Sequence, residues 1–443
     1  MNETLIIILA IEIAIVLVFL IVEQPFLGVA FMISSLPVID LLPEIPYLTS
    51  VVPLVGAITI IVFLLQKRNA PGKSLIKFQS VLVFGILFII WIYLSNPEAA
   101  WSGIDRNWVL TFIQLWVLMF LVGELLDTPK KQQVVMLIFS GVTIVSAFYA
   151  VTLGEIAEDA LSSARVSGLA TNANEAARYF VVAMVFLSYL RTQTKTPFFR
   201  FLALGGILIT FLGVFFTVSR SGILLLFGAQ GLIIFLQPQL KQKTGLTLVF
   251  VVGFIIIGFL SESIFSIIRD IFPTITEGTD TMGLRYNLWK AGWQMWLDHP
   301  VRGVGIGMYQ HSMGSYILNL VGPVRVDLVA HNTFVQVLSE TGIIGFILFM
   351  LMVFNALKNF WNAKFKDDLE AFSLRNVWLI VFLVVVVVGG ITQSGHASKL
   401  TWMVMGVCVY FANQAKMAEQ VDVAKETTVK YSRKKLWIER HKI

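Results

Sequence analysis

The chain has 443 residues, of which 57% are hydrophobic and only 14% are charged, and its formal net charge is +6. An average soluble domain has roughly 25% charged residues, so this composition excludes an ordinary soluble domain. A hydrocarbon core of about 30 Å requires about 20 apolar residues in each helix that crosses it. The sequence supplies such runs repeatedly, and we therefore predict an all-α, polytopic membrane protein.

The apolar runs predict twelve or thirteen transmembrane helices. The second run contains Pro37 and Asp40, so it is either a full span or a broken element, and the total depends on it. The candidate spans are residues 5–22, 26–42, 47–66, 81–94, 108–126, 134–153, 176–190, 198–218, 222–236, 246–260, 333–356, 377–391 and 401–413.

These spans divide the chain into four parts. We expect N-terminal transmembrane helices over residues 1–260, one large hydrophilic loop with amphipathic helices over 261–330, and C-terminal transmembrane helices over 331–415. A basic tail over 416–443 completes the chain. The large loop is the longest stretch available for chemistry in water.

The distribution of Lys and Arg predicts which side each loop faces. Most of the 33 basic residues lie in alternate connections and in the tail, and loops rich in Lys and Arg stay in the cytoplasm during insertion. The large loop then lies on the opposite, outer side. The basic residues assigned to that side are Arg106, Arg165, Arg178, Arg220, Arg269, Arg285, Lys290, Arg302, Arg325 and Lys399.

Arginine dominates the outer side, although topology requires only positive charge. The planar guanidinium group binds two phosphate oxygens at once and stays charged when it is partly desolvated. The outer side is therefore suited to a phosphate-bearing ligand. The alternative interpretation is that outer loops retain some solvated charge without a specific role.

Three of these arginines belong to the transmembrane part of the chain. Arg220 lies in a connection so short that its two spans must form a tight hairpin, which leaves the side chain at the membrane boundary. An ionisable group held there is costly unless it is paired or used. Arg165 precedes a stretch of small and amide residues suited to a sugar, and Arg178 is either a ligand-binding residue or a helix-end anchor.

The large loop contains an amphipathic helix over residues 283–296, which we expect to end at His299. Trp289, Trp293 and Trp296 share one face of it, which is typical of an interfacial anchor and compatible with sugar stacking. Arg285 lies one turn before Trp289 on that face. The glycine-rich stretch over 303–307 follows no strand, so we expect a turn that allows close backbone approach rather than a nucleotide loop.

His331 begins the segment that becomes the next span, at the outer boundary. Its imidazole is suited to accept a proton near neutral pH. Glu340 falls on the opposite face of a continuous helix, which argues against a pair between the two, and His396 has no comparable context. Motifs for metal ligands are absent from the sequence, so we expect no metal and no cofactor.

The later half of the chain resembles the O-antigen ligase and polymerase family of bacterial envelope glycosyltransferases. The resemblance rests on the Ser-Arg-Ser-Gly hairpin, the Gly-Leu-Arg-Tyr-Asn-Leu-Trp helix, the His-Pro-Val-Arg-Gly-Val-Gly-Ile-Gly turn and the segment from His-Asn-Thr-Phe to Glu-Thr-Gly. It implies a fold of the GT-C type, with the loop at the periplasmic face of the bacterial inner membrane. By position, His331, Arg220 and Arg285 match the catalytic residues of the family.

The resemblance further implies a metal-independent, inverting glycosyltransferase of lipopolysaccharide biosynthesis. Its donor is a glycan on undecaprenyl diphosphate, and we expect Arg165, Arg178, Asn332 and Arg302 to bind substrate. The acceptor is the lipid A-core for a ligase, a second lipid-linked glycan for an O-antigen or exopolysaccharide polymerase, or a protein hydroxyl for an O-oligosaccharyltransferase. We favour the ligase. A transporter of lipid-linked glycan is the alternative from another class.

Overall fold

The computed structural model describes most of the chain. The described residues are 3–42, 51–68, 79–95, 106–153, 157–159, 162–236, 281–321, 328–363, 365 and 368–415. The predicted span at 246–260, the first part of the large loop and the basic tail lie outside them, and they stay predictions.

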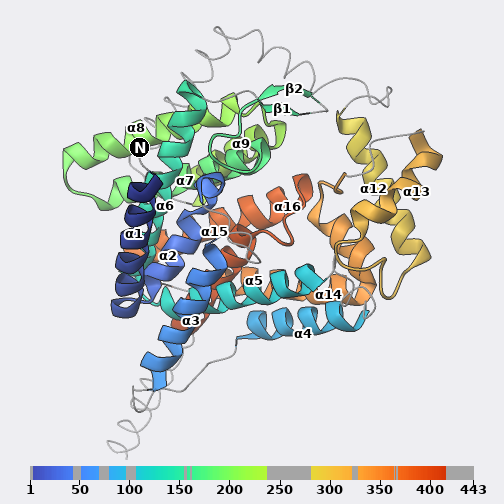
Figure 1. Ribbon diagram of the computed structural model, residues 1–443, viewed down its shortest axis with the longest axis horizontal. Helices are drawn as coiled ribbons and strands as arrows, with labels where there is room; N and C mark the ends of the chain where they lie inside the picture. The colour runs from blue at the N-terminus through green and yellow to red at the C-terminus, as the bar shows by residue number, and fades with distance from the viewer. Residues whose placement is uncertain are drawn as a thin grey trace, which may run out of the picture.

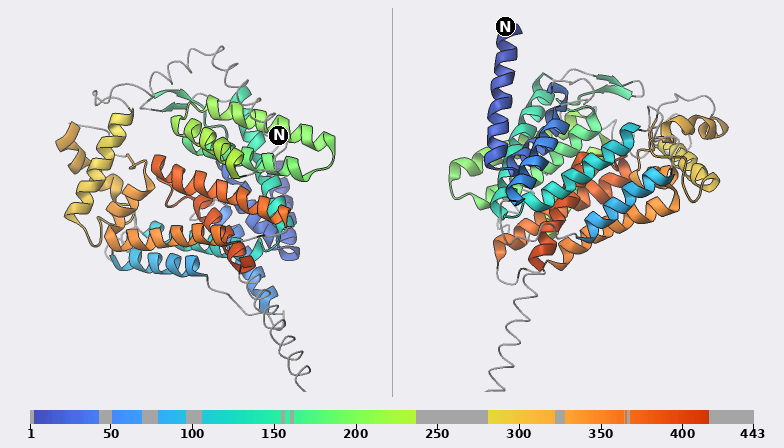
Figure 2. Two further views of the ribbon diagram at one scale, coloured as in Figure 1. Left: turned by 180° about the vertical axis from the view of Figure 1, so that it is seen from behind. Right: turned by 60° about the horizontal axis from the view of Figure 1, so that its bottom comes forward.

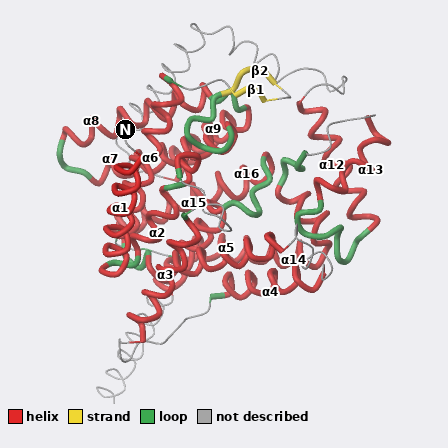
Figure 3. Tube along the Cα trace, in the orientation of Figure 1, coloured by secondary structure: helices red, strands yellow, loops and turns green. Residues whose placement is uncertain are grey.

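Helices make up almost all of the described structure (Figures 1 and 3). Their bounds are α1 (Glu3–Glu23), α2 (Phe26–Ser34), η1 (Leu36–Leu41), α3 (Val52–Arg68), α4 (Ser80–Ser95), α5 (Arg106–Leu125), α6 (Pro129–Thr152), α7 (Ala173–Gln193), α8 (Pro197–Phe216), α9 (Arg220–Leu236), α12 (Thr281–Asp298), α13 (Tyr309–Val321), α14 (Thr333–Asn362), α15 (Leu369–Phe382), η2 (Leu383–Val388) and α16 (Gly389–Thr392). A last helix covers residues 399–415. The short strands β1 (Ala157–Asp159) and β2 (Ser162–Arg165) form an antiparallel hairpin.

Several of these helices are suited to crossing a membrane. Among the described residues, five helical segments are long and apolar enough to do so: Trp108–Leu125, Pro129–Thr152, Pro197–Phe216, Thr333–Asn362 and Leu369–Thr392. Three shorter apolar helices accompany them. The predicted all-α polytopic membrane protein is therefore confirmed, while the total of twelve or thirteen spans stays a prediction.

The second apolar run is a broken element, as the sequence suggested. Helix α2 ends at Ser34, and the run continues as the short 3-10 helix η1. Pro37 is the second residue of η1, and Val38 has a non-helical backbone conformation, with φ of −132°. Because proline cannot donate the backbone hydrogen bond of a helix interior, the α-helix stops before it.

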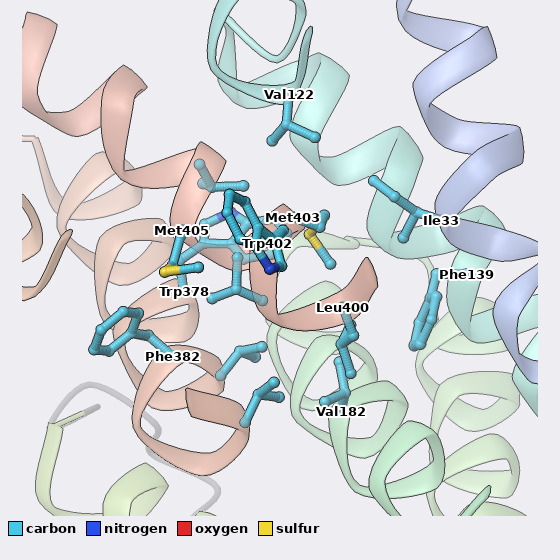
Figure 4. Close-up of a cluster of buried hydrophobic side chains, with 14 of the residues drawn as sticks. Ile33, Val122, Phe139, Val182, Trp378, Phe382, Leu400, Trp402, Met403 and Met405 are labelled. Atoms are coloured by element: carbon cyan, nitrogen blue, oxygen red, sulfur yellow. The ribbon is translucent and has the colours of Figure 1, made fainter. Parts of the chain in front are cut away.

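Helix α7 lies at the centre of the bundle. It packs against α6, α8, α9 and α15, and its side chains are buried from Ala176 to Tyr189. Next to it, side chains from α2, α5, α6, α15 and the last helix form an apolar cluster that includes Phe139, Trp378 and Trp402 (Figure 4). A helix buried on every side holds the residues at its ends in fixed positions.

The large loop contributes two helices, α12 and α13, which lie across one end of the bundle beyond the start of α14 (Figures 1 and 2). Their shared core includes Leu288, Met295, Tyr309 and Met313. Helix α12 ends at Asp298, directly before His299, as the sequence predicted. Burial raises the pKa of the Tyr309 phenol, which therefore donates to the Leu288 carbonyl as a neutral group.

Helix α14 is bent at Gly342, where φ is 65° and ψ is −171°. A bend of this kind frees backbone carbonyls from the helical ladder, and buried carbonyls need new donors. The amides of Val304 and Gly305 fill that need, donating to the carbonyls of Ser339 and Glu340 at 2.9 Å each. The glycine-rich turn therefore makes the close backbone approach that the sequence predicted.

Candidate active site

Three helix N-termini meet at the loop of residues 393–398, which we call the 393–398 loop. The side-chain amide of Gln393 donates to the Asn174 carbonyl at 3.0 Å and to the Ser221 hydroxyl at 3.4 Å. The Gln393 carbonyl accepts a hydrogen bond from the Thr333 hydroxyl at 2.8 Å. These three partners stand in the first turns of α7, α9 and α14. We call this end of the bundle, where α7, α9 and α14 begin, the site end.

Glycine at position 222 allows α7 and α9 to approach closely at the site end. A Cβ atom at Gly222 would lie 2.5 Å from the Cβ of Ala177, closer than real side chains approach. Ala177 directly precedes Arg178, and Gly222 lies two residues after Arg220. The close approach therefore brings the backbones that carry these two arginines together.

The guanidinium group of Arg178 is buried at this junction, since the residue is only 1% exposed. Its Nη1 lies against the 393–398 loop, where a Cβ on Gly395 would be 3.2 Å away. The nearest carboxylate, Glu175, is 3.7 Å from Nη2, and Nε and Nη1 have no hydrogen-bond partner among the described residues. This burial argues against a helix-end anchor. A buried guanidinium with unfilled donors is suited to bind an anion.

Arg220 is the first residue of α9 and follows a strained turn. Ser219 caps the helix, accepting from the Gly222 amide at 3.1 Å and donating to the Asn174 side chain at 2.7 Å. Val218, two residues before Arg220, has a φ of 50°. A β-branched residue rarely adopts a positive φ, and such strain is concentrated at functional sites.

His331 lies in the turn before α14 and is also strained, with a φ of 47°. It stands one residue before the cap of α14 rather than inside the helix. Asn332 is that cap, because its side-chain oxygen accepts from the amides of Phe334 and Val335 at 3.0 and 3.1 Å. Asn332 therefore has a structural role that the sequence analysis did not expect, and its contact with substrate stays a prediction.

Helix α12 joins the site end through Trp289. The indole nitrogen of Trp289 donates to the Ala330 carbonyl, directly before His331, at 2.9 Å. Arg285 lies one turn before Trp289 on the same helix face. Helix α12, which carries Arg285, thus contacts the residue before His331, whereas α9, which carries Arg220, contacts the 393–398 loop through Ser221.

The remaining predicted residues lie on other elements. Arg165 ends strand β2, paired with Ala157, and its side chain is outside the described part of the structure. Arg302 is exposed on the turn after α12, and its backbone lies at the bend of α14 rather than at the turn before α14. Their roles in substrate binding stay predictions.

Several positively charged groups and helix dipoles lie at the site end. Each helix N-terminus carries the equivalent of about half a positive charge, and three of them meet here with Arg178 and Arg220. Lys399 begins the last helix directly after the 393–398 loop, is partly buried and interacts electrostatically with Glu175. An anion held here therefore faces fixed dipoles and charged groups that need no rearrangement.

Sequence reasoning missed the contributions of Gln393, Lys399 and His396. His396 is 2% exposed and faces Glu340, which is 0% exposed, at 3.6 Å. The two residues are far apart in sequence, so helical spacing gives no signal for their contact. The signal that was available is the polar stretch Thr-Gln-Ser-Gly-His between two apolar runs.

Residues 205–350 match the family model described as O-antigen ligase. This match supports the O-antigen ligase family for this part of the chain. No curated protein matches the chain. The matched segment includes Arg220, Arg285 and His331, whereas Arg178 and the 393–398 loop lie outside it. The match supports a membrane glycosyltransferase of the O-antigen ligase or polymerase type, acting on lipid-linked glycan.

Proposed function

We propose that the protein transfers a glycan from undecaprenyl diphosphate to an acceptor hydroxyl at the periplasmic face of the inner membrane. The observation that carries the proposal is the meeting of Arg178, Arg220 and three helix N-termini beside the turn that holds His331. The anion bound by these groups would be the diphosphate of the lipid-linked donor. Its prenyl chain would lie in the bilayer around the bundle.

The arginines would stabilise the departing diphosphate. Breaking the bond between the anomeric carbon and the phosphate oxygen leaves negative charge on the diphosphate, which preorganised guanidinium groups and helix dipoles stabilise. Arg178 is suited to this role because two of its nitrogen atoms are buried without a hydrogen-bond partner in the described structure. The diphosphate then leaves without needing a proton or a metal ion.

The acceptor hydroxyl loses a proton as its oxygen attacks the anomeric carbon, and we assign His331 as the base that takes this proton. Direct displacement inverts the configuration at the anomeric carbon. Arg285 lies on α12, which contacts the residue before His331, and this contact supports a role for Arg285 in binding the donor or the acceptor.

The favoured acceptor is the lipid A-core oligosaccharide, which makes the protein an O-antigen ligase. The same site would serve an O-antigen or exopolysaccharide polymerase, whose acceptor is a second lipid-linked glycan. A protein O-oligosaccharyltransferase is a third form of the same reaction. In all three forms the donor chemistry at Arg178, Arg220 and His331 is unchanged.

Purified protein with lipid-linked glycan tests the reaction class. We expect undecaprenyl diphosphate and a glycosylated acceptor as products, whereas movement of intact donor across a vesicle membrane without products would indicate a transporter. Glycan ladders from a deletion strain then identify the acceptor. Loss of a ligase leaves long chains that are not attached to the core, and loss of a polymerase leaves single repeats on the core.

A further inference from the structure

A second buried polar cluster lies beneath the glycine-rich turn, with Glu340 and His396 at its centre. Oε2 of Glu340 is 3.6 Å from Nε2 of His396. The imidazole ring of His396 stacks on the rings of Trp108 and Phe112, whose centroids are 6.3 and 5.9 Å away. A carboxylate in such apolar surroundings is costly unless a positive charge lies next to it.

The two carboxylate oxygens of Glu340 have different environments. Oε1 accepts from the Gln336 side chain at 2.9 Å and from the Tyr309 amide at 3.3 Å. Oε2 has no hydrogen-bond partner among the described residues, and neither do the ring nitrogens of His396. The Tyr309 phenol also interacts electrostatically with Glu340. The charge on Oε2 is therefore directed at His396.

This pair connects the glycine-rich turn with the site end. The Glu340 carbonyl accepts from the Gly305 amide at 2.9 Å, so Glu340 holds the turn of the large loop. His396 belongs to the 393–398 loop, whose Gly395 amide donates to the Thr333 hydroxyl at 2.7 Å and whose backbone lies against Arg178. A shift of His396 would therefore move the backbone against which Arg178 packs.

We propose that Glu340 and His396 form a buried ion pair that positions Arg178 and the start of α14 for the lipid-linked donor. The pair does not touch the reacting atoms, so both are positioning residues. The inference rests on the proposed function only in assigning the anion at Arg178 to the donor diphosphate. The ion pair itself is tested without any glycan.

A double-mutant cycle in thermal unfolding tests the pair. Glu340→Gln keeps an oxygen for Gln336 and Tyr309 and removes only the charge that faces His396, and His396→Gln removes the imidazole. We expect each variant to lower the melting temperature and the double variant to lower it no further than the worse single variant, as for groups that act as a unit. Additive losses in the double variant would overturn the ion pair.

Donor kinetics test the positioning role. We expect Glu340→Gln and His396→Gln to raise the donor KM about tenfold and to lower kcat as well, because a displaced Arg178 weakens both the binding of the donor and the stabilisation of the departing diphosphate. Glu370→Gln, at the opposite end of the bundle, should leave the donor KM unchanged. If the two variants instead showed an unchanged donor KM and a kcat that fell only in proportion to the amount of folded protein, the positioning role would be overturned.

Binding of undecaprenyl diphosphate separates this inference from the proposed function. If wild-type protein transferred no glycan, the proposed function would fail, and the unfolding cycle would still decide whether the ion pair exists. Undecaprenyl diphosphate would then be added to each protein and the rise in melting temperature measured. A smaller rise for both variants than for wild type would support the positioning role. Equal stabilisation would overturn it.

Discussion

Two residues next to the predicted catalytic groups adopt backbone conformations that side chains rarely favour. Val218 and His331 have φ of 50° and 47°, and among the described non-glycine residues they alone have a positive φ. A left-handed conformation costs an L-residue roughly 1–2 kcal/mol. The surrounding contacts hold both turns in place, which is the pattern expected where a side chain must point in one direction.

The backbone of His331 determines which substitution tests its chemistry. Asparagine tolerates a positive φ better than alanine, so His331→Asn should fold normally. We expect it to lower kcat by about 10²- to 10⁴-fold, the typical contribution of a general base, and to leave the melting temperature unchanged. A rate measurement on purified protein checks this, and unchanged transfer by the folded variant would remove His331 from the reaction.

Arg178 should contribute to activity at the expense of stability. Arg178→Met fills the same space with an apolar side chain and leaves Glu175, which is partly exposed, in water. Replacing a poorly compensated buried charge by an apolar group is neutral or stabilising, so we expect unfolding to become harder by about 1 kcal/mol. Transfer should fall about 100-fold.

Arg200→Met is the matched control, because Arg200 lies on α8 beyond the opposite end of α7 and donates to the Thr194 carbonyl. Its transfer rate should equal that of wild type. A less stable Arg178→Met protein with unchanged specific activity would mean that Arg178 is structural.

At the residue scale, the sequence predicted the outer arginines through charge chemistry and short connections. Arg220 was predicted as a site residue because the three-residue connection between its two spans keeps its side chain at the membrane boundary. The burial of Arg178 was not predictable, since it depends on α9 approaching Ala177 and on the 393–398 loop covering the guanidinium. The pair of Glu340 and His396 was missed because it joins two elements that are distant in the chain.

At the scale of single elements, the hairpin between α8 and α9 depends on the glycine after its arginine. Gly222→Ala would bring two Cβ atoms to 2.5 Å, and overpacking of this kind costs about 1–3 kcal/mol. We expect a lower melting temperature and a higher donor KM, because α9 and α7 must separate at Arg220 and Arg178.

Gly228→Ala, on the same helix, is the matched control for Gly222→Ala. A Cβ atom at Gly228 would meet no atom within 4 Å, and alanine favours a helix over glycine by about 1 kcal/mol. Gly228→Ala should therefore unfold at a higher temperature than wild type and keep its activity. If the two variants behaved alike, the close approach of α7 and α9 would have no role.

The bend of α14 depends on the close approach of the glycine-rich turn at Gly303. A Cβ at Gly303 would lie 2.4 Å from the Glu340 carbonyl carbon, and its φ of 72° suits glycine. Gly303→Ala should destabilise the protein by at least about 1 kcal/mol, with faster proteolysis in the large loop. Gly205→Ala, which has open space around its Cβ, should show neither effect.

Element bounds were the most predictable feature of the fold. Long apolar runs define spans because the bilayer sets a length for each helix, and α4, α5, α9 and α14 begin within a few residues of the expected positions. The bend at Gly342 was not predictable, because the turn that binds the freed carbonyls comes from another part of the chain. The residue pattern of α14 alone does not show that the amides of a distant turn bind its carbonyls.

In the whole molecule, the bundle brings three helix N-termini to one end. Helices α7, α9 and α14 all begin there, and the polar 393–398 loop joins them. Helices α12 and α13 lie across that end (Figure 2). The bilayer would bring a prenyl chain to the side of the bundle, while the diphosphate and glycan would lie at the site end.

A structure of the protein in a lipid nanodisc with undecaprenyl-diphosphate-linked glycan, determined by electron cryomicroscopy, would show where the donor diphosphate binds. We expect density for the diphosphate within hydrogen-bonding distance of Arg178 and Arg220, with the first sugar on the side of His331. A diphosphate bound at the opposite end of the bundle, or held away from both arginines, would contradict it.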